Sequence, residues 1–140
     1  MNNSATVRMK YRPIIIHGVT RIAFISAALI VPNTSFEGNV KENTIKEVNE
    51  EAGLNVSADL VIAVQDREKH NLPIYAYKVC KVFVLCSVID GSFQENIETV
   101  ESKYFGIDEL PILATEKNTK DQIAMCFDAY YAKNWVTLFD

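Results

Sequence analysis

Apolar residues along the chain follow two patterns, one typical of strands and the other of helices. Segments rich in Ile, Val and aromatic residues predict strands. The longest of them, residues 74–89, is apolar at most positions, so we expect a central strand with a neighbour along each edge. The other expected strands lie at residues 14–16, 22–31, 54–56, 59–65 and 101–106.

Helical spacing is clearest in residues 41–52. Ile45, Val48 and Ala52 recur there at i, i+3 and i+7 and form one apolar stripe. Gly53 follows at the place where helices commonly end in a left-handed residue. We therefore expect one amphipathic helix that ends at this glycine.

A second helix is expected near the C-terminus, after a cap at Asn118 or Thr119. Five apolar residues follow at the spacing of a helix that packs on the body of the protein. They are Ile123, Cys126, Phe127, Tyr130 and Tyr131. Residues 108–111 are expected to form a turn or a single helical turn, and Trp135 is expected to pack rather than bind.

The composition is that of an ordinary globular protein. The 140 residues are 49% hydrophobic and 23% charged, which suits one domain over residues 1–140 and excludes collagen-like, low-complexity and wholly disordered chains. The net charge of −4 gives no general attraction to nucleic acid or to anionic lipid. The longest uncharged apolar stretch, residues 22–32, is too short to span a bilayer. Three cysteines without zinc-binding spacing suggest reduced thiols in a cytoplasmic protein.

Charge is unevenly distributed, because residues 1–36 hold four basic residues and no acidic one. Three explanations remain open. The segment is a basic targeting peptide, a set of ordinary N-terminal strands, or a segment whose ancestral sequence has been replaced. We expect strands of the same domain, because the apolar segment 74–89 needs cover on its faces and neighbours on its edges.

Three carboxylates lie on one side of the helix expected at residues 41–52. Glu47, Glu50 and Glu51 stand at i, i+3 and i+4, away from the apolar stripe. Like charges at this spacing repel one another, and a divalent cation such as Mg²⁺ or Mn²⁺ relieves the repulsion while bridging to phosphate oxygens. The alternative is a solvated acidic face without a ligand.

The string KEVNEEAGL at residues 46–54 resembles the second half of the Nudix box. Six of the seven fixed positions in that half match, and at the seventh Lys46 stands where the family has Arg. The matching residues are Glu47, Val48, Glu50, Glu51, Gly53 and Leu54. Similarity to bacterial Nudix pyrophosphatases of the ADP-ribose and CDP-choline hydrolysing type continues from residue 42 to the C-terminus.

The first half of the box departs from the family pattern. The leading Gly is expected at position 32 and the first Glu at position 38, where Pro32 and Gly38 stand instead. The usual Gly-Gly loop before the helix is absent. These departures coincide with the acid-free segment, so residues 37–140 are clearly family-like and residues 1–36 are poorly matched.

The resemblance implies an α/β fold of the Nudix type, an α/β/α sandwich around a mixed sheet. It also implies hydrolysis of a nucleoside diphosphate linked to another moiety, like ADP-ribose or CDP-choline. Glu50 and Glu51 would bind Mg²⁺ or Mn²⁺, and Glu47 would be a third ligand or the base for water. Lys46 would orient Glu47, although it lacks the bidentate fork of Arg.

A further carboxylate from a distant loop often completes such sites. Glu98 and Glu101 are the candidates in this chain, and an exposed polar loop is their alternative explanation. His70, Tyr75 and Tyr77 could also contact a substrate. For these three residues we expect a solvated loop histidine and two core tyrosines.

Three interpretations of function follow. The first is a metal-dependent Nudix pyrophosphohydrolase that acts on a small nucleotide diphosphate derivative, slowly relative to relatives with an intact loop. The second is a degenerate Nudix domain that binds a nucleotide or a partner with little or no catalysis. The third is a fragment that needs a second chain to complete its sheet. A homodimer is left open by the first interpretation.

Overall fold

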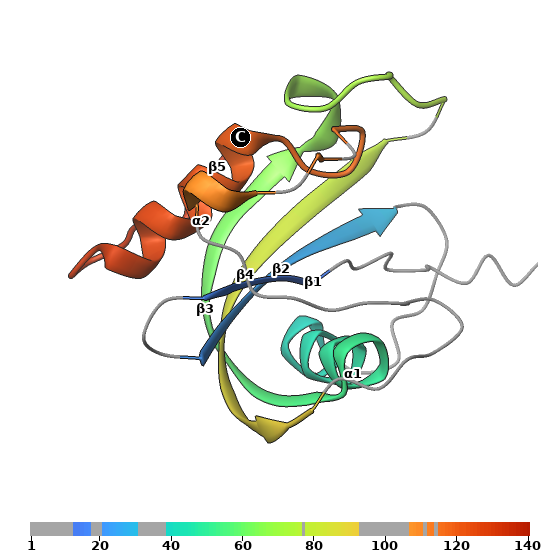
Figure 1. Ribbon diagram of the computed structural model, residues 1–140. Helices are drawn as coiled ribbons and strands as arrows, with labels where there is room; N and C mark the ends of the chain where they lie inside the picture. Colours follow the sequence, from blue (N-terminus) through green and yellow to red (C-terminus); the bar gives the residue numbers. More distant parts are fainter. Residues whose placement is uncertain are drawn as a thin grey trace, which may run out of the picture.

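The computed structural model shows a mixed α/β fold (Figure 1). The described backbone comprises residues 13–17, 21–30, 39–76, 78–92, 107–110, 112–113 and 115–140. Side chains are described from residue 39 onwards within these ranges, except that of Glu51. The strand expected at residues 101–106 lies outside them.

Five strands of the described backbone form one sheet in the order β1-β2-β4-β3-β5. The pairs are antiparallel except for β3 and β5, which are parallel, so the sheet is mixed. β4 lies at the centre, between β2 and β3, as its apolar sequence predicts. The strands are β1 (Pro13–His17), β2 (Arg21–Ile30), β3 (Leu54–Asp66), β4 (Val79–Gly91) and β5 (Leu138–Phe139).

Strands β1 and β2 come from the acid-free segment of the sequence. β2 pairs with the central strand along its length, from Ile22 opposite Ser87 to Ile30 opposite Val79. The expectation that this segment contributes strands to the same sheet is therefore confirmed for β1 and β2.

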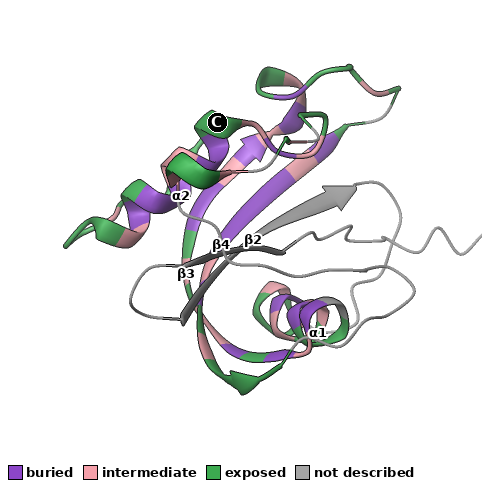
Figure 2. Cartoon of the chain, viewed as in Figure 1, coloured by how far each residue is buried: buried purple, intermediate pink, exposed green. Residues whose placement is uncertain are grey.

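Two helices, α1 (Val40–Ala52) and α2 (Lys120–Tyr131), lie on opposite faces of the sheet (Figure 1). Side chains of β4 alternate between them: Val82 and Cys86 pack toward α1, and Phe83 packs toward α2. Each helix turns its buried side to the sheet (Figure 2). The fold is thus the α/β/α sandwich that the resemblance to the Nudix family implies. No helix in the described part of the chain is long and apolar enough to cross a membrane.

The two strands expected at residues 54–56 and 59–65 are a single strand, β3. Its pairing with β4 shifts register at three places, which are typical of β-bulges. As a result the adjacent residues Ile62 and Ala63 both pack on the α2 side, where strict alternation would separate them. The gap between the two expected strands, from residue 56 to residue 59, therefore marks an irregularity within one strand and not a break.

The segment expected as a strand from residue 74 begins to pair only at Val79. Residues 74–76 belong to a loop that the buried Arg67 holds in place. Its guanidinium donates to the Pro73 carbonyl at 2.7 Å and lies 3.5 Å from the ring centroid of Tyr75. These contacts replace strand pairing there. At the other end, β4 continues past the expected limit at residue 89 and ends at Gly91.

The start of α2 was predicted correctly. Thr119 caps the helix, and its side chain and that of Gln122 bond each other's backbone N–H groups. The apolar stripe is buried over its first two turns, but Tyr131 is 70% exposed. Ala129 faces the sheet in the last turn instead, so the expectation for Tyr131 was wrong.

Three smaller expectations are confirmed. A 3₁₀ turn spans Ile107–Glu109. Trp135 packs against the α2 side of the core, and its Nε1 donates to the Ile62 carbonyl at 2.9 Å. All three cysteines are free. Burial raises the pKa of the Cys86 and Cys126 thiols to about 12, which keeps them protonated and unreactive.

Candidate active site

Capping interactions fix both ends of α1. The Asn39 side chain accepts from the Glu42 N–H at 2.9 Å, and the Glu42 carboxylate accepts from the Asn39 N–H at 3.3 Å. Gly53 ends the helix with a φ of 67°, in the left-handed region. Val48 and Ala52 are 1% and 0% exposed and anchor the helix to the sheet. The helix expected at residues 41–52 is confirmed and begins one residue earlier.

Glu47 and Glu50 lie on one flank of this buried stripe. Glu47 is half-buried, and Glu50, one turn further on, is exposed. Lys46 Nζ lies 3.7 Å from Glu50 Oε1. Both side chains of this pair are exposed, so it contributes only a few tenths of a kcal/mol. Orientation of Glu47 by Lys46 stays a prediction.

The acidic flank supplies part of a donor set that fits Mg²⁺ or Mn²⁺, since hard cations of this size prefer carboxylate oxygens. Glu47 and Glu50 are its described members. Among the side chains that the structure describes, no group of three or more His, Cys, Asp and Glu residues could hold a metal ion. The side chain of Glu51 and all of Glu98 and Glu101 lie outside that part of the chain. Their assignment as metal ligands therefore stays a prediction.

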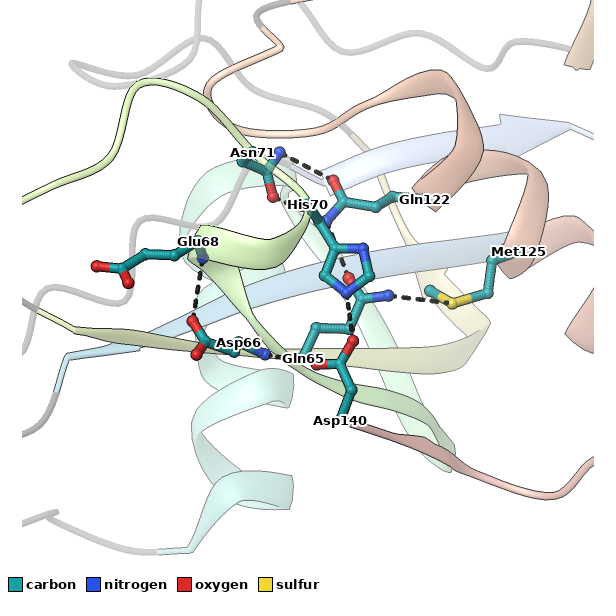
Figure 3. Close-up of polar contacts among 8 residues, drawn as sticks. All are labelled: Gln65, Asp66, Glu68, His70, Asn71, Gln122, Met125 and Asp140. Atoms are coloured by element: carbon teal, nitrogen blue, oxygen red, sulfur yellow. Dashed lines mark hydrogen bonds and ion pairs between the residues drawn. The ribbon is translucent and has the colours of Figure 1, made fainter.

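A second polar cluster lies where β3 ends, beneath the start of α2 (Figure 3). Gln122 is at its centre. The Gln122 amide nitrogen donates to Gln65 Oε1 at 2.9 Å and to Asn71 Oδ1 at 2.8 Å, and its oxygen accepts from Asn71 Nδ2 at 3.1 Å. All three side chains are buried. Because their buried polar atoms all have hydrogen-bond partners, the cluster fixes the loop after β3 against α2.

Lys81 extends from β4 into this cluster and is 3% exposed. Its ammonium group donates to Asn118 Oδ1 at 3.2 Å, to Gln122 Oε1 at 3.4 Å and to the Lys117 carbonyl. All three acceptors are neutral. Burial, aided by the nearby charge of Arg67, lowers the pKa of Lys81 to about 8.

This buried charge predicts a pH-dependent stability. The folded-state pKa of Lys81 lies below its ordinary value of 10.5, so between about pH 8 and 10.5 the unfolded chain binds the additional proton. The contribution of Lys81 to the free energy of unfolding therefore becomes more favourable as pH rises across that window. We expect the unfolding free energy of the wild type, relative to Lys81→Met, to rise by about 2–3 kcal/mol between pH 7 and 10. Urea unfolding at several pH values measures this difference.

Lys78→Met is the control, because the hydrogen bond from Lys78 to Glu68 raises the pKa of this exposed lysine. A pKa raised above the ordinary value of 10.5 affects stability only near and above that pH, so the corresponding difference should stay nearly constant between pH 7 and 10. The prediction would be contradicted if the unfolding free energies of the wild type and of Lys81→Met changed with pH in parallel.

Of the remaining sequence candidates, His70 and Tyr75 lie near this cluster. His70 is an exposed loop residue, as expected, and its Nε2 pairs with the Asp140 carboxylate. Tyr75 was expected as a core strand residue, but it lies half-buried in a loop, with its ring against the Arg67 guanidinium. Tyr77 lies outside the described residues.

Sequence reasoning missed the buried cluster. One signal for it existed, since Lys81 interrupts the apolar string VCKVFVLC at residues 79–86. A charged residue in a central strand needs buried partners. Its amide partners gave no signal, because Asn71 and Gln122 have the sequence surroundings of surface residues.

Comparisons with known proteins agree with the fold. No family model matches the chain. The chain is 37% identical over 99 residues to a protein of Bacillus subtilis (strain 168) whose name assigns it provisionally to the ADP-ribose pyrophosphatases. The match covers 71% of this chain and 48% of that protein, so the chain spans about half the length of this curated relative.

Two solved structures are similar in both fold and sequence. One is an ADP-ribose pyrophosphatase from Streptococcus suis 89-1591, with a TM-score of 0.69 and 39% identity over 82% of this chain and 90% of that one. The other is a UDP-X diphosphatase, with a TM-score of 0.66 and 28% identity over 81% of this chain and 60% of that one. These similarities, the α/β/α sandwich and the half-box on α1 show that the chain belongs to the Nudix hydrolase family.

Proposed function

We propose that the chain is a metal-dependent pyrophosphohydrolase that cleaves the diphosphate bond of a nucleoside diphosphate linked to another moiety, like ADP-ribose or CDP-choline. The observation that carries the proposal is the acidic flank of α1, on a helix whose caps and buried stripe hold it against the sheet. The names of the relatives support it, since they specify pyrophosphatase or diphosphatase action on nucleotide derivatives.

In this proposal Glu50 and Glu51 hold Mg²⁺ or Mn²⁺, and Glu47 is a third ligand or the base. An ion bound there would neutralise the charge of the diphosphate and lower the pKa of its bound water. The oxygen of water bonds to one phosphorus, and the bridging P–O bond breaks. Glu47 as base accepts the proton that water loses.

A binding domain with little or no catalysis is the second candidate. Pro32 and Gly38 in the first half of the box favour it, although both lie outside the described residues. Lys46 favours it as well, because lysine cannot make the bidentate contact of the family's arginine. Such a domain would bind a nucleotide without turning it over.

The test is hydrolysis of ADP-ribose, CDP-choline and nucleoside triphosphates with Mg²⁺ or Mn²⁺, with the Streptococcus suis relative assayed in parallel. We expect metal-dependent turnover of a diphosphate-linked substrate, about a hundredfold slower than in the relative, because small misplacements of catalytic groups cost about that much. EDTA should abolish it. Saturable nucleotide binding without turnover would establish the second candidate, and neither binding nor turnover would contradict both.

A further inference from the structure

Four sulfur atoms lie in the described part of the chain, three in thiols and one in a thioether. Cys80, Cys86 and Cys126 are free thiols, and burial is the main cause that raises the pKa of each. Peroxides attack the thiolate form, which a raised pKa suppresses. Met125 is half-buried, and its thioether has no proton to lose before it reacts. Among these four sulfur atoms, that of Met125 is therefore the most reactive toward a peroxide.

A hydrogen-bond donor lies beside the sulfur of Met125. Gln65 Nε2 donates to Met125 Sδ at 3.7 Å (Figure 3). Gln65 comes from the end of β3 and Met125 from the second turn of α2, so this contact joins the sheet to the helix. A thioether is a weak acceptor, so the donor gains little from it.

The buried cluster fixes the direction of the Gln65 amide. The Lys81 ammonium group can only donate, and it donates to Gln122 Oε1 at 3.4 Å. The other end of that amide, Gln122 Nε2, therefore donates to Gln65 Oε1 at 2.9 Å. A flipped Gln65 amide would bring two N–H donors together at this point, so Gln65 Nε2 stays beside Met125.

We propose that Met125 is a site of reversible oxidation by peroxide, and that the Gln65 amide accommodates the sulfoxide. The sulfur attacks one oxygen of hydrogen peroxide, and an S–O bond forms as the O–O bond breaks. The proton of the transferred oxygen passes to the departing hydroxide, which leaves as water. The sulfur is oxidised by two electrons, and the peroxide is reduced to water. A reductase that acts on methionine sulfoxide reverses the change. This chemistry is independent of the proposed hydrolysis.

The spacing of the two side chains suits the product. An N–H···O hydrogen bond is about 2.9 Å long, and together with an S–O bond it exceeds the 3.7 Å between Gln65 Nε2 and Met125 Sδ. The oxygen therefore fits between them in a bent arrangement, and the unbranched side chain of Met125 can turn it toward the amide. A polar group in a half-buried place costs stability unless it is hydrogen-bonded, so Gln65 offsets the cost of oxidation.

Peptide mass spectrometry of the folded full chain after treatment with hydrogen peroxide locates the oxygen, and thermal melts before and after treatment measure its cost. We expect a sulfoxide on Met125, unmodified cysteines and a melting temperature within about 2 °C of that of the untreated protein. Met125→Leu is the matched control, because it conserves volume and retains Met1 and Met9, so it corrects for their oxidation. The proposal would be overturned if Met125 stayed unmodified at peroxide concentrations that oxidise free methionine, or if the cysteines reacted first.

Gln65→Glu tests the role of the amide. It keeps an oxygen for Gln122 Nε2 but replaces the donor beside Met125 with a second oxygen. We expect oxidation to lower the melting temperature of this variant by about 5 °C or more, because the sulfoxide then lacks its partner. Equal losses in the wild type and in Gln65→Glu would overturn the proposal. NMR of the ¹⁵N-labelled wild type needs no variant: the Gln65 side-chain N–H resonance should move downfield on oxidation, and an unchanged resonance would also overturn the proposal.

Discussion

Replacing Glu50 with Gln is expected to lower kcat/KM for the best substrate by about 10²–10³-fold at saturating Mg²⁺. The amide keeps the size of the side chain but loses the charged oxygen that a hard cation requires. Glu51→Gln is expected to have an effect of the same order. Stability should change little, because Glu50 is exposed and its ion pair with Lys46 is weak. Steady-state rates and a thermal melt of each variant measure both quantities.

Glu42→Gln is the control on the same helix. It removes one negative charge from α1, but its amide oxygen can still accept from the Asn39 N–H and keep the cap. We expect a near wild-type rate from it. Equal rates in the wild type, Glu50→Gln and Glu51→Gln would mean that the acidic flank is a solvated surface and that the metal-dependent chemistry does not operate in this chain.

Gly91→Ala is expected to destabilise the fold strongly. Its φ of 100° is one that L side chains rarely adopt, and the new Cβ would lie 2.4 Å from the Gly53 oxygen. That neighbour is backbone, so the turn after α1 must shift. Strain and overpacking together predict a loss of about 2–5 kcal/mol in the free energy of unfolding.

Urea unfolding at neutral pH measures that loss. Ser92→Ala is the matched control, since Ser92 is the exposed neighbour and such surface changes stay within about 0.5 kcal/mol. A Gly91→Ala protein as stable as Ser92→Ala would show that the turn and the strand end do not rest on each other as described.

Local signals made α1 predictable from sequence to within one residue. The stripe at Val48 and Ala52 and the stop at Gly53 all act over a few residues, and nothing from elsewhere in the fold overrides them. The same locality placed Glu47 and Glu50 on one flank. The placement of these two carboxylates could therefore be predicted from helical spacing, whereas their candidate role as metal ligands came from the resemblance to the Nudix box.

Contacts between distant segments account for the errors. The strand expected from residue 74 starts at Val79, because Arg67 bonds the carbonyls of Pro73 and Glu116 and holds a loop there. The hydrogen bond from Asn55 to Asp90 escaped prediction for the same reason. Asn55 and Asp90 meet only through the register of two strands, and bulges in β3 make that register unreadable from spacing.

The buried cluster around Gln122 has a consequence for how this protein can diverge. Hydrogen bonds link the four side chains of Gln65, Asn71, Lys81 and Gln122. Replacing one of them therefore leaves a buried polar partner without its hydrogen bond. A half-satisfied network is worse than an apolar core. Descendants of this sequence can therefore abandon the cluster only by replacing it as a set, through less stable intermediates. Such a barrier predicts that these four positions change slowly and together.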